Sequence, residues 1–546
     1  MSGVCCKKPL PVVVRFTLQR IMSIVFVIVA MMAEPYANVG VSNAFSDHAV
    51  LQRDMNVPIW GTASSGEKVS VTLGSQTKEV TTPSNGRWKV TLDPMDAAGP
   101  LTMTIKSAKN TVTVKDVYIG EVWQVAGQSN MDTRLSFYPN LADAISKADV
   151  PKMRYFTLRQ PGQKTGGQNP WVVVSPATAG NLSATGYFFG KEILNTTGVA
   201  VGLVVTAVGG TTITQWMDPA TLSANPDITN SDRGGMWNLW VAPALGYGIK
   251  GTIWIQGEQN CNATDAPTYG KRFKLLINGW RKAWGQGDFS FYFGQLSSTS
   301  GTAGPDDVSY VAQVREGQRL ALALPHTAMT VNFDIGKGDW HYPEKPEAGR
   351  RLSLPARALL YGEDDLVYSG PLFSRKIIEG NRVKLLFTHT GGGLVAKGGT
   401  LSGFAVAAAS GSFVWGTATI SGDTVIVSSP SVGNPARVRY GWSNVPAASL
   451  FNKEGLPASP FTTESPDLPT AVTWSGRIPA SPHVVSIVAK EQRTLYPVNI
   501  LGKRIAGGSG AFQIVWFSGG SRGVVMQPDD GGRAMSASGK EPYENR

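Results

Sequence analysis

Two runs of consecutive apolar residues place the strongest constraint on how this 546-residue chain can fold. They read VGLVVTAV over residues 201–208 and GTIWIQ over residues 251–256. Runs of this kind are typical of parallel strands that are buried on both faces of a sheet. Helix-like stretches accompany them at residues 186–197 and 268–285. Strands that alternate with helices predict a doubly wound α/β domain, which we place at residues 118–368.

Polar and apolar residues alternate on either side of this region. Val69, Val71 and Leu73 alternate with polar neighbours, and an Asn-Gly pair then leads into a second alternating stretch at residues 88–92. This pattern predicts a β-hairpin within a small β-sandwich-like domain over residues 38–117. Similar alternation predicts a further all-β domain at residues 369–468.

The two ends of the chain differ from these domains. Basic residues precede an apolar stretch from Ile21 to Ala33, which is typical of a secretory signal peptide, assigned here to residues 1–37. The stretch is shorter than the about 20 apolar residues that a membrane-spanning helix needs. An uncleaved N-terminal anchor is the alternative, because Met22 is a second possible start of translation. We therefore expect a secreted or luminal protein without a membrane span once the leader is removed. Residues 469–546 are rich in Gly and Ser, and no role is assigned to them.

Composition excludes several classes of protein. Hydrophobic residues make up 42% and charged residues 16% of the chain, which excludes a wholly disordered protein. Removing the four basic residues of the leader lowers the formal charge from +11 to +7, and the remaining basic residues are scattered, so nucleic acid is not expected as a partner. Cys261 is the sole cysteine after the leader, which excludes an intramolecular disulfide and a cysteine-based metal site. The sequons at Asn181, Asn195 and Asn262 are glycosylation acceptors if the source is eukaryotic.

A candidate nucleophile follows an apolar strand in EVWQVAGQSNMD, residues 121–132. Ligands of α/β sheets bind beyond the carboxyl ends of the strands, so Ser129 lies where a nucleophile is expected. Gly127 permits a tight turn and close approach of a substrate. The alternative is a turn serine that caps a helix.

A serine nucleophile needs a base, and elimination among five histidines favours His341. It lies in a loop after the apolar strand predicted at residues 328–333, and Asp339 is two residues earlier, where it can orient the imidazole. A structural histidine is the alternative. The remaining four histidines lie in β segments, beside a proline or in the tail: His48, His326, His389 and His483.

Donors for a developing oxyanion are expected after the two buried strands. Gly209 and Gly210 follow the first strand with bare backbone N–H groups, and Gln256 follows the second with a side-chain amide. A plain turn is the alternative for the glycine pair. Glu258 either holds loops together or competes with Asp339 as the acid of a catalytic triad.

Five collinear motifs within residues 40–468 resemble those of the sialate O-acetylesterase family, within the SGNH-like hydrolases. The motifs are VLQRDMNVPIWGTA, GRWKVTL, VYIGEVWQVAGQSNM, GMWNLWVAPALGYGIKGTIWIQGEQN and DWHYPEKPEAGRRL. The resemblance implies a flavodoxin-like three-layer α/β hydrolase domain flanked by small all-β domains. It implies removal of O-acetyl groups from sugars without a metal or an organic cofactor. On this resemblance Ser129 is the nucleophile, His341 the base and Asp339 its partner, with Gly209, Gln256 and the Ser129 N–H as oxyanion donors.

Departures from the family pattern leave the substrate open. QGEQN stands where the family usually has QGESN, and Tyr342 separates His341 from the following proline. A sialate O-acetylesterase is the first hypothesis, and an acetylxylan or other polysaccharide deacetylase is the alternative. A non-catalytic glycan-binding protein is the third hypothesis. The sequence does not indicate an oligomeric state.

Overall fold

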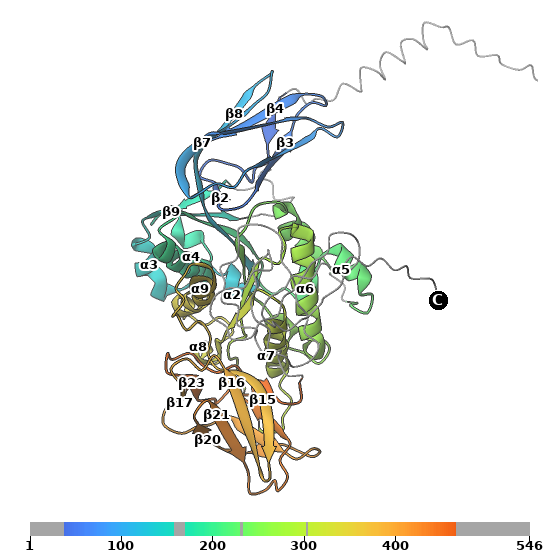
Figure 1. The fold of residues 1–546 in the computed structure, drawn as a ribbon, viewed down its shortest axis with the longest axis vertical. Helices are drawn as coiled ribbons and strands as arrows, with labels where there is room; N and C mark the ends of the chain where they lie inside the picture. The colour runs from blue at the N-terminus through green and yellow to red at the C-terminus, as the bar shows by residue number, and fades with distance from the viewer. Residues whose placement is uncertain (1–37, 158–169, 230–232, 302–303, 466–546) are drawn as a thin grey trace, which may run out of the picture. The chain divides into compact units, whose positions relative to one another are not determined.

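The computed structural model describes residues 38–157, 170–229, 233–301 and 304–465. An α/β part with a mixed sheet and additional all-β sheets make up these ranges (Figure 1). The predicted signal peptide at residues 1–37 and the tail at 469–546 lie outside them. Within the described ranges, no helix has the length and apolar character needed to cross a membrane.

A sheet with strand order β10-β9-β11-β8-β12-β13-β14 forms the centre of the α/β part. Neighbouring strands from β9 to β14 are parallel, and β10 is antiparallel to β9. The two apolar runs form β11 and β12 on either side of β8, and every residue in both strands is buried, as predicted. The strands are β8 (Thr111–Gly127), β9 (Val150–Thr157), β10 (Val172–Val174), β11 (Val201–Ala207), β12 (Gly251–Ile255), β13 (Ser290–Gly294) and β14 (Thr327–Thr330). The strand predicted at residues 328–333 is therefore shorter than expected, because a helix begins at Phe333.

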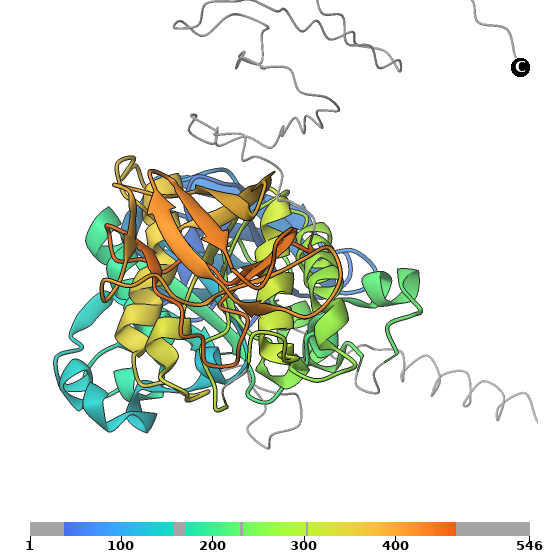
Figure 2. The same cartoon turned by 90° about the horizontal axis from the view of Figure 1, so that it is seen from below.

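Helices cover both faces of this sheet. The helices α4 (Ala184–Thr197) and α9 (Lys345–Leu360) pack together on one face, and α6 (Tyr269–Trp284) and α7 (Tyr310–Leu320) pack on the other (Figures 1 and 2). Successive side chains of β8 point to opposite faces of the sheet and pack in different hydrophobic cores. Trp123 packs in the core under α4 and α9, and Val122 packs in the core under α6. The shorter α-helices are α2 (Ser129–Asp132), α3 (Ala142–Ser146), α5 (Pro219–Ala224) and α8 (Phe333–Gly336).

Two sheets make up the N-terminal β part, and β8 continues from one of them into the α/β sheet. Its first half pairs with β7, and its second half, from Glu121 to Gly127, pairs with β11. The boundary predicted between residues 117 and 118 thus falls inside one strand. The other strands are β1 (Gly40–Val41), β2 (Val50–Gln52), β3 (Val57–Thr62), β4 (Lys68–Leu73), β5 (Gln76–Thr81), β6 (Arg87–Leu92) and β7 (Ala98–Lys106).

The hairpin predicted at the Asn-Gly pair is wrong, although both flanking strands exist. The strand β6 buries alternate residues, as its pattern predicts, but it pairs with β3, whereas β5 pairs with β4. Residues 82–86 separate β5 from β6, and Pro83 among them has no N–H to donate to a strand partner. The connection therefore carries the chain from one sheet to the other.

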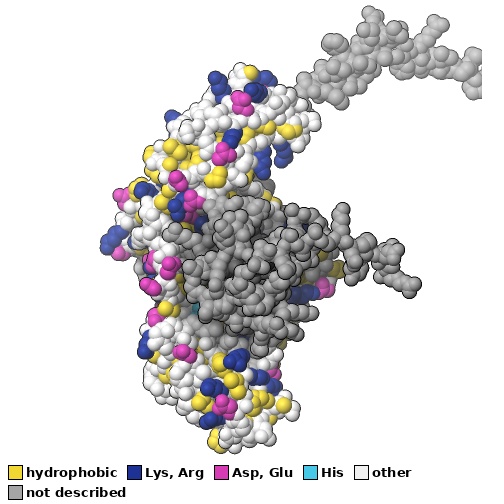
Figure 3. All heavy atoms as spheres, viewed as in Figure 1, with side chains coloured by type: hydrophobic (Ala, Val, Ile, Leu, Met, Phe, Trp, Pro, Cys, Tyr) yellow, Lys and Arg dark blue, Asp and Glu magenta, His cyan; other side chains and the backbone are white. Residues whose placement is uncertain are grey.

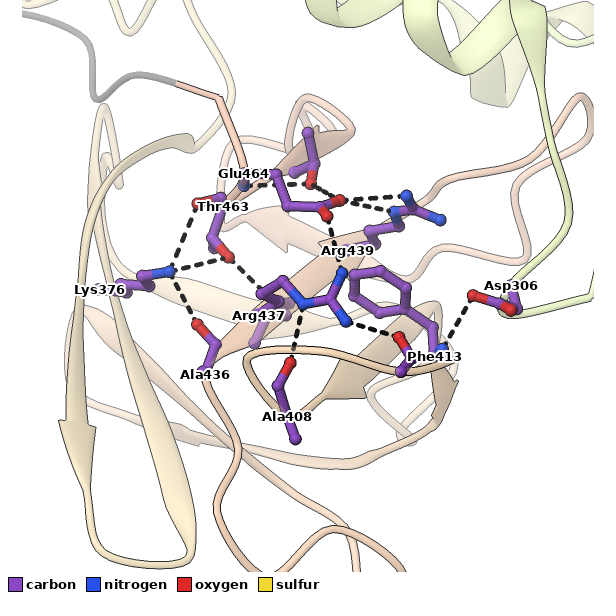
Figure 4. A network of polar contacts seen from close by, with 12 residues as sticks. Asp306, Lys376, Ala408, Phe413, Ala436, Arg437, Arg439, Thr463 and Glu464 are labelled. Carbon is purple, nitrogen blue, oxygen red and sulfur yellow. Dashed lines mark hydrogen bonds and ion pairs between the residues drawn. The ribbon is translucent and has the colours of Figure 1, made fainter.

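The C-terminal β part is built from short antiparallel strands around its own hydrophobic core. Its strands are β15 (Leu372–Glu379), β16 (Arg382–Thr388), β17 (Leu394–Ala396), β18 (Phe404–Ala407), β19 (Val414–Trp415), β20 (Thr417–Ser421), β21 (Thr424–Ser428), β22 (Arg437–Tyr440), β23 (Leu450–Asn452) and β24 (Phe461–Thr462). On β22, Arg437 and Arg439 both pair with Glu464 (Figure 4). The N–H of Phe413 donates to Asp306 in the loop before α7 at 2.9 Å.

A buried arginine connects this β part to the end of β13. The Arg315 guanidinium donates to the carbonyl oxygens of Leu296 at 2.9 Å and Ser297 at 2.6 Å, and to that of Ser443 at 2.6 Å. Burial lowers the pKa of Arg315 to about 9.

On the face shown in Figure 3, basic and acidic side chains are interspersed over the β parts.

Candidate active site

Ser129 begins helix α2 directly beyond the carboxyl end of β8. Gly127 at that end has φ 131°, and a Cβ atom there would lie 2.1 Å from the carbonyl oxygen of Ile255. The neighbouring strand β12 therefore requires a glycine at this position, and the close approach of a substrate to Gly127 stays a prediction. Ser129 is half-buried, and its backbone N–H has no hydrogen-bond partner among the described residues.

The predicted base lies in the loop between α8 and α9. His341 and Asp339 are both exposed, and the backbone N–H of His341 donates to Asp339 Oδ1 at 2.8 Å. Within the described residues, the His341 ring has no hydrogen bond to Ser129 or to Asp339. Catalytic hydrogen bonds are often long in the absence of substrate, so this geometry leaves the assignment a prediction.

The side chain of Asn130 joins the three segments that carry the predicted site. Its Nδ2 atom donates to Glu258 Oε1 at 2.6 Å and to the backbone oxygen of Trp340 at 2.9 Å. Asn130 is adjacent to Ser129 in the chain, and Trp340 is adjacent to His341. The structure thus brings the strand end with Ser129 together with the His341 loop and the Glu258 turn.

A buried lysine completes this contact from the first residue of α9. Lys345 Nζ donates to Asn130 Oδ1 and lies 3.9 Å from the ring centroid of Tyr342. Burial lowers the pKa of Lys345 to about 7, against the opposing effect of Glu258, which favours its charged form. Burial also raises the pKa of Glu258, whose Oε2 atom is buried without a hydrogen-bond partner in the described structure.

Gly209 lies beside Ser129 as predicted, but its N–H is already engaged. It donates to Asp132 Oδ2 at 3.1 Å. A Cβ atom on Gly209 would lie 3.6 Å from Ser129 Cβ, and Gly210 beside it adopts φ 72° in the turn after β11. Burial raises the pKa of Asp132, while the Gly209 N–H and Arg134 lower it.

Gln256 is fully buried, and its amide is used within the protein. Its Nε2 atom donates to the Thr211 oxygen at 2.9 Å and to Asn260 Oδ1 at 2.8 Å, and its Oε1 atom accepts from the Tyr269 hydroxyl at 2.9 Å. Both amide hydrogens are therefore engaged, and neither is free for an oxyanion in this structure. The geometry supports a structural role for Gln256 in the turn after β12.

Comparisons with known proteins show which proteins this chain resembles. The profile of the family described as carbohydrate esterase, sialic acid-specific acetylesterase, matches residues 119–350, which include Ser129 and His341. Human sialate O-acetylesterase is 31% identical over 376 residues, covering 59% of this chain and 71% of the human protein. The rat sialate O-acetylesterase is 29% identical over 507 residues, covering 76% and 92%. A crystal structure of XAC1771, a carbohydrate acetylesterase from Xanthomonas citri, is 36% identical with a TM-score of 0.73, covering 78% of this chain and 99% of that one.

The chain belongs to the sialic acid-specific acetylesterase family of carbohydrate esterases. It is a carboxylic ester hydrolase that acts on O-acetyl esters of sugars.

Three residues of this esterase site were missed by the sequence analysis: Asn130, Asp132 and Lys345. Asn130 and Asp132 belong to the motif that indicated Ser129, and Asp132 is one helical turn after the serine. Lys345 carried a stronger signal, because a 3.6-residue period puts it on one face with Ala348 and Leu352. A lysine on an apolar helix face is rarely buried unless it is paired.

Proposed function

We propose that this esterase removes acetyl groups from sugars through an acetyl-serine intermediate, with Ser129 as nucleophile, His341 as general base and Asp339 as its partner. Ser129 Oγ attacks the acetyl carbonyl carbon while His341 accepts the hydroxyl proton. The tetrahedral oxyanion then collapses, the bond to the sugar oxygen breaks, and His341 returns the proton to that oxygen. Water repeats the sequence on acetyl-Ser129 and releases acetate.

The oxyanion in this proposal is stabilised by backbone N–H groups. The N–H of Ser129 is the first donor, since it has no partner in the described part of the chain. The N–H of Gly209 is the second, and it becomes available when the oxyanion takes the position of the Asp132 carboxylate. Such donors act on the transition state because they are already oriented before the reaction.

The hydrogen bond from Asn130 to the Trp340 oxygen is the observation that carries this proposal. It joins the neighbour of the proposed nucleophile to the neighbour of the proposed base. A serine that only capped a helix would not require a histidine loop at this position.

Replacing Ser129 by Ala tests the mechanism. We expect acetate release from a simple aryl acetate to fall by roughly 10³-fold or more, as when a triad member is removed. Asn181→Ala at an exposed position is the matched control and keeps wild-type turnover. Near-normal turnover by the Ser129→Ala enzyme would refute the proposal.

An O-acetylated sialic acid is the substrate we propose first, because the human and rat relatives are named sialate O-acetylesterases. Acetylated xylan or another polysaccharide is the alternative substrate. It is compatible with the Xanthomonas citri relative, which is described only as a carbohydrate acetylesterase. Acetate release from O-acetylated sialic acids and from acetylated xylan, compared as kcat/KM, decides between them. A non-catalytic glycan-binding protein would bind glycans but would not react with a serine-directed organophosphate.

Finer features of the fold and location belong to the same proposal. We assign the α/β part to the flavodoxin-like SGNH hydrolases, which is supported by a largely parallel sheet with helices on both faces. The domain ranges given above stay predictions, as does secretion or entry into a lumen through a leader at residues 1–37. Asn181 and Asn195 are exposed, whereas the Asn262 amide donates to Asp265, so the first two are the better glycosylation acceptors.

A further inference from the structure

Lys345 is a fully buried lysine at the start of α9, with an exposed fraction of 0%. It shares the inner face of the helix with Ala348 and Leu352, which are equally buried. A charged side chain is costly to bury unless it is paired and hydrogen-bonded. The partners of Lys345 therefore indicate why a lysine occupies this position.

The amide of Asn130 lies between Lys345 and Glu258. An ammonium group can only donate hydrogen bonds, so Lys345 requires the oxygen of the amide, and an ionised carboxylate can only accept, so Glu258 requires its nitrogen. Both requirements are met, since Asn130 Oδ1 accepts from Lys345 Nζ and Asn130 Nδ2 donates to Glu258 Oε1. The three side chains form an ion pair bridged by a neutral amide.

These two hydrogen bonds fix the Asn130 amide in one orientation. That orientation determines a contact between the two segments of the active site. With its oxygen held by Lys345, the Asn130 nitrogen faces both Glu258 and the backbone oxygen of Trp340 at 2.9 Å. A rotated amide would present its oxygen to that carbonyl and lose the contact. The contact between the Ser129 turn and the His341 loop thus depends on the charges at both ends of the amide.

We infer that Lys345 is a positioning residue whose ammonium group, opposed by Glu258 across the Asn130 amide, holds the Ser129 turn against the His341 loop, so that hydrolysis requires Lys345 to be charged. This inference rests on the proposed function. It adds a residue that has no contact with the reacting atoms.

The surroundings of Lys345 allow its charge to be lost near neutral pH. Burial lowers its pKa to about 7, far below that of an ordinary lysine. The groups that face Lys345 are Glu258 on the turn after β12, Asp339 and Tyr342 in the His341 loop, Glu344 before α9, and Tyr138. The groups that face Glu258 besides these are Cys261 and Tyr269. The charge of Glu258 raises the pKa of Lys345, and the charge of Lys345 lowers the pKa of Glu258. The apparent pKa seen in a pH–rate profile therefore belongs to the pair of residues.

The test is the pH profile of kcat/KM for a neutral aryl acetate between pH 5 and 10, which reports ionisations of the free enzyme. We expect the wild-type rate to fall as Lys345 loses its proton above about pH 7. Lys345→Met removes this alkaline fall and lowers the best rate roughly 10- to 100-fold, the value of a charge-assisted hydrogen bond. Glu258→Gln keeps an acceptor for Asn130 but removes the anion, so the fall moves to lower pH.

Two controls separate positioning from general damage. Lys147 is an exposed lysine that pairs with Asp143 at 2.8 Å, and Lys147→Met keeps the wild-type profile. In the double variant Lys345→Met with Glu258→Gln no unpaired carboxylate remains buried, so it recovers at least about threefold over Lys345→Met alone.

A wild-type rate that stays level from pH 7 to 10 overturns the inference, as does a Lys345→Met enzyme with the wild-type profile. If Lys345→Met does not fold, the wild-type profile and its shift in Glu258→Gln still decide the question. An active Ser129→Ala enzyme overturns the proposed function itself. An inactive Ser129→Ala enzyme together with a level wild-type profile overturns only the role of Lys345.

Discussion

Asp132 accepts the backbone N–H of Gly209 at 3.1 Å, at the position where an oxyanion donor is expected beside Ser129. The Asp132 carboxylate oxygen is negatively charged, as the oxyanion of the transition state would be, and it occupies the same N–H donor. The substrate must therefore displace Asp132 from Gly209 before that N–H can stabilise the transition state. A charge-assisted hydrogen bond is roughly twice as strong as a neutral one, so this displacement is costly.

Replacing Asp132 by Asn is expected to raise kcat/KM roughly 3- to 10-fold, because a neutral amide oxygen yields the Gly209 N–H more easily than a carboxylate does. Steady-state kinetics on an aryl acetate at pH 8 measure the change. Asp143→Asn, at an exposed residue of α3, is the control and leaves the rate unchanged. A fall in kcat/KM for Asp132→Asn would mean that the carboxylate assists the reaction instead.

Asp339 and Glu258 remain the two candidates for the acid of the triad, and their contacts allow a clean comparison. Asp339→Asn retains an oxygen for the His341 backbone N–H, so the loop is preserved while the charge is lost. We expect its kcat to fall roughly 10⁴-fold, by analogy with a serine protease triad. Glu258→Gln still accepts from Asn130 and is expected to lose less than about tenfold at its optimal pH.

The reverse ranking of these two variants would assign the triad acid to Glu258. Circular dichroism and thermal unfolding of both proteins establish that each is folded before the rates are compared.

Gln256 is expected to contribute to stability and not to transition-state binding. Gln256→Leu removes the side-chain hydrogen bonds to the Thr211 oxygen, Asn260 Oδ1 and the Tyr269 hydroxyl. Asn260 Oδ1 keeps the Ile213 N–H, and the Tyr269 hydroxyl keeps the backbone oxygen of residue 256, so these losses cost less than that of the Thr211 oxygen, at about 1–3 kcal/mol. Urea denaturation should show a free energy of unfolding lower by about 2–4 kcal/mol. The neighbouring exposed residue provides the control Gln259→Leu, which changes stability little. Wild-type stability combined with a large loss of kcat would restore Gln256 as an oxyanion donor.

Lys345 should make stability and activity respond to pH in opposite directions. Its folded pKa, about 7, lies below its ordinary value of 10.5, so between these values the unfolded chain binds more protons than the folded one. Stability then rises with pH in this window, by up to about 1.4 kcal/mol per pH unit, while the rate falls. Denaturation at pH 7, 8 and 9 measures the slope for the wild type and for Lys345→Met. An equal slope in both proteins would contradict the assignment to Lys345.

Local patterns in the sequence predicted the strands and helices well, because burial on two faces leaves a recognisable apolar run. The strands β11 and β12 and the helices α4 and α6 occur where such patterns predicted them. The pairing of β6 did not follow from its pattern, since alternation identifies a buried face but not the partner strand. The continuity of β8 was missed for a related reason: polar and apolar residues alternate in its first half, whereas its second half is mostly apolar and fully buried, which resembles two elements.

The site was predicted at the level of its segments and not of its hydrogen bonds. Ser129, Gly209 and Gln256 all follow parallel strands, so their convergence at one edge of the sheet follows from topology. The protein partners of the Gln256 amide and of the Gly209 N–H, Asn260 and Asp132, could not be predicted, because side-chain partners cannot be read from spacing alone.

The unbroken course of β8 has a mechanical consequence for the enzyme. A strand hydrogen-bonded along both halves transmits force along its length, and residues 111–127 offer no linker at which one half could turn against the other. The N-terminal sheets therefore cannot swing aside as a lid over the site. The N-terminal part is thereby fixed to the strand that ends next to the nucleophile, so the orientation of that part and the position of Ser129 are set by the same strand.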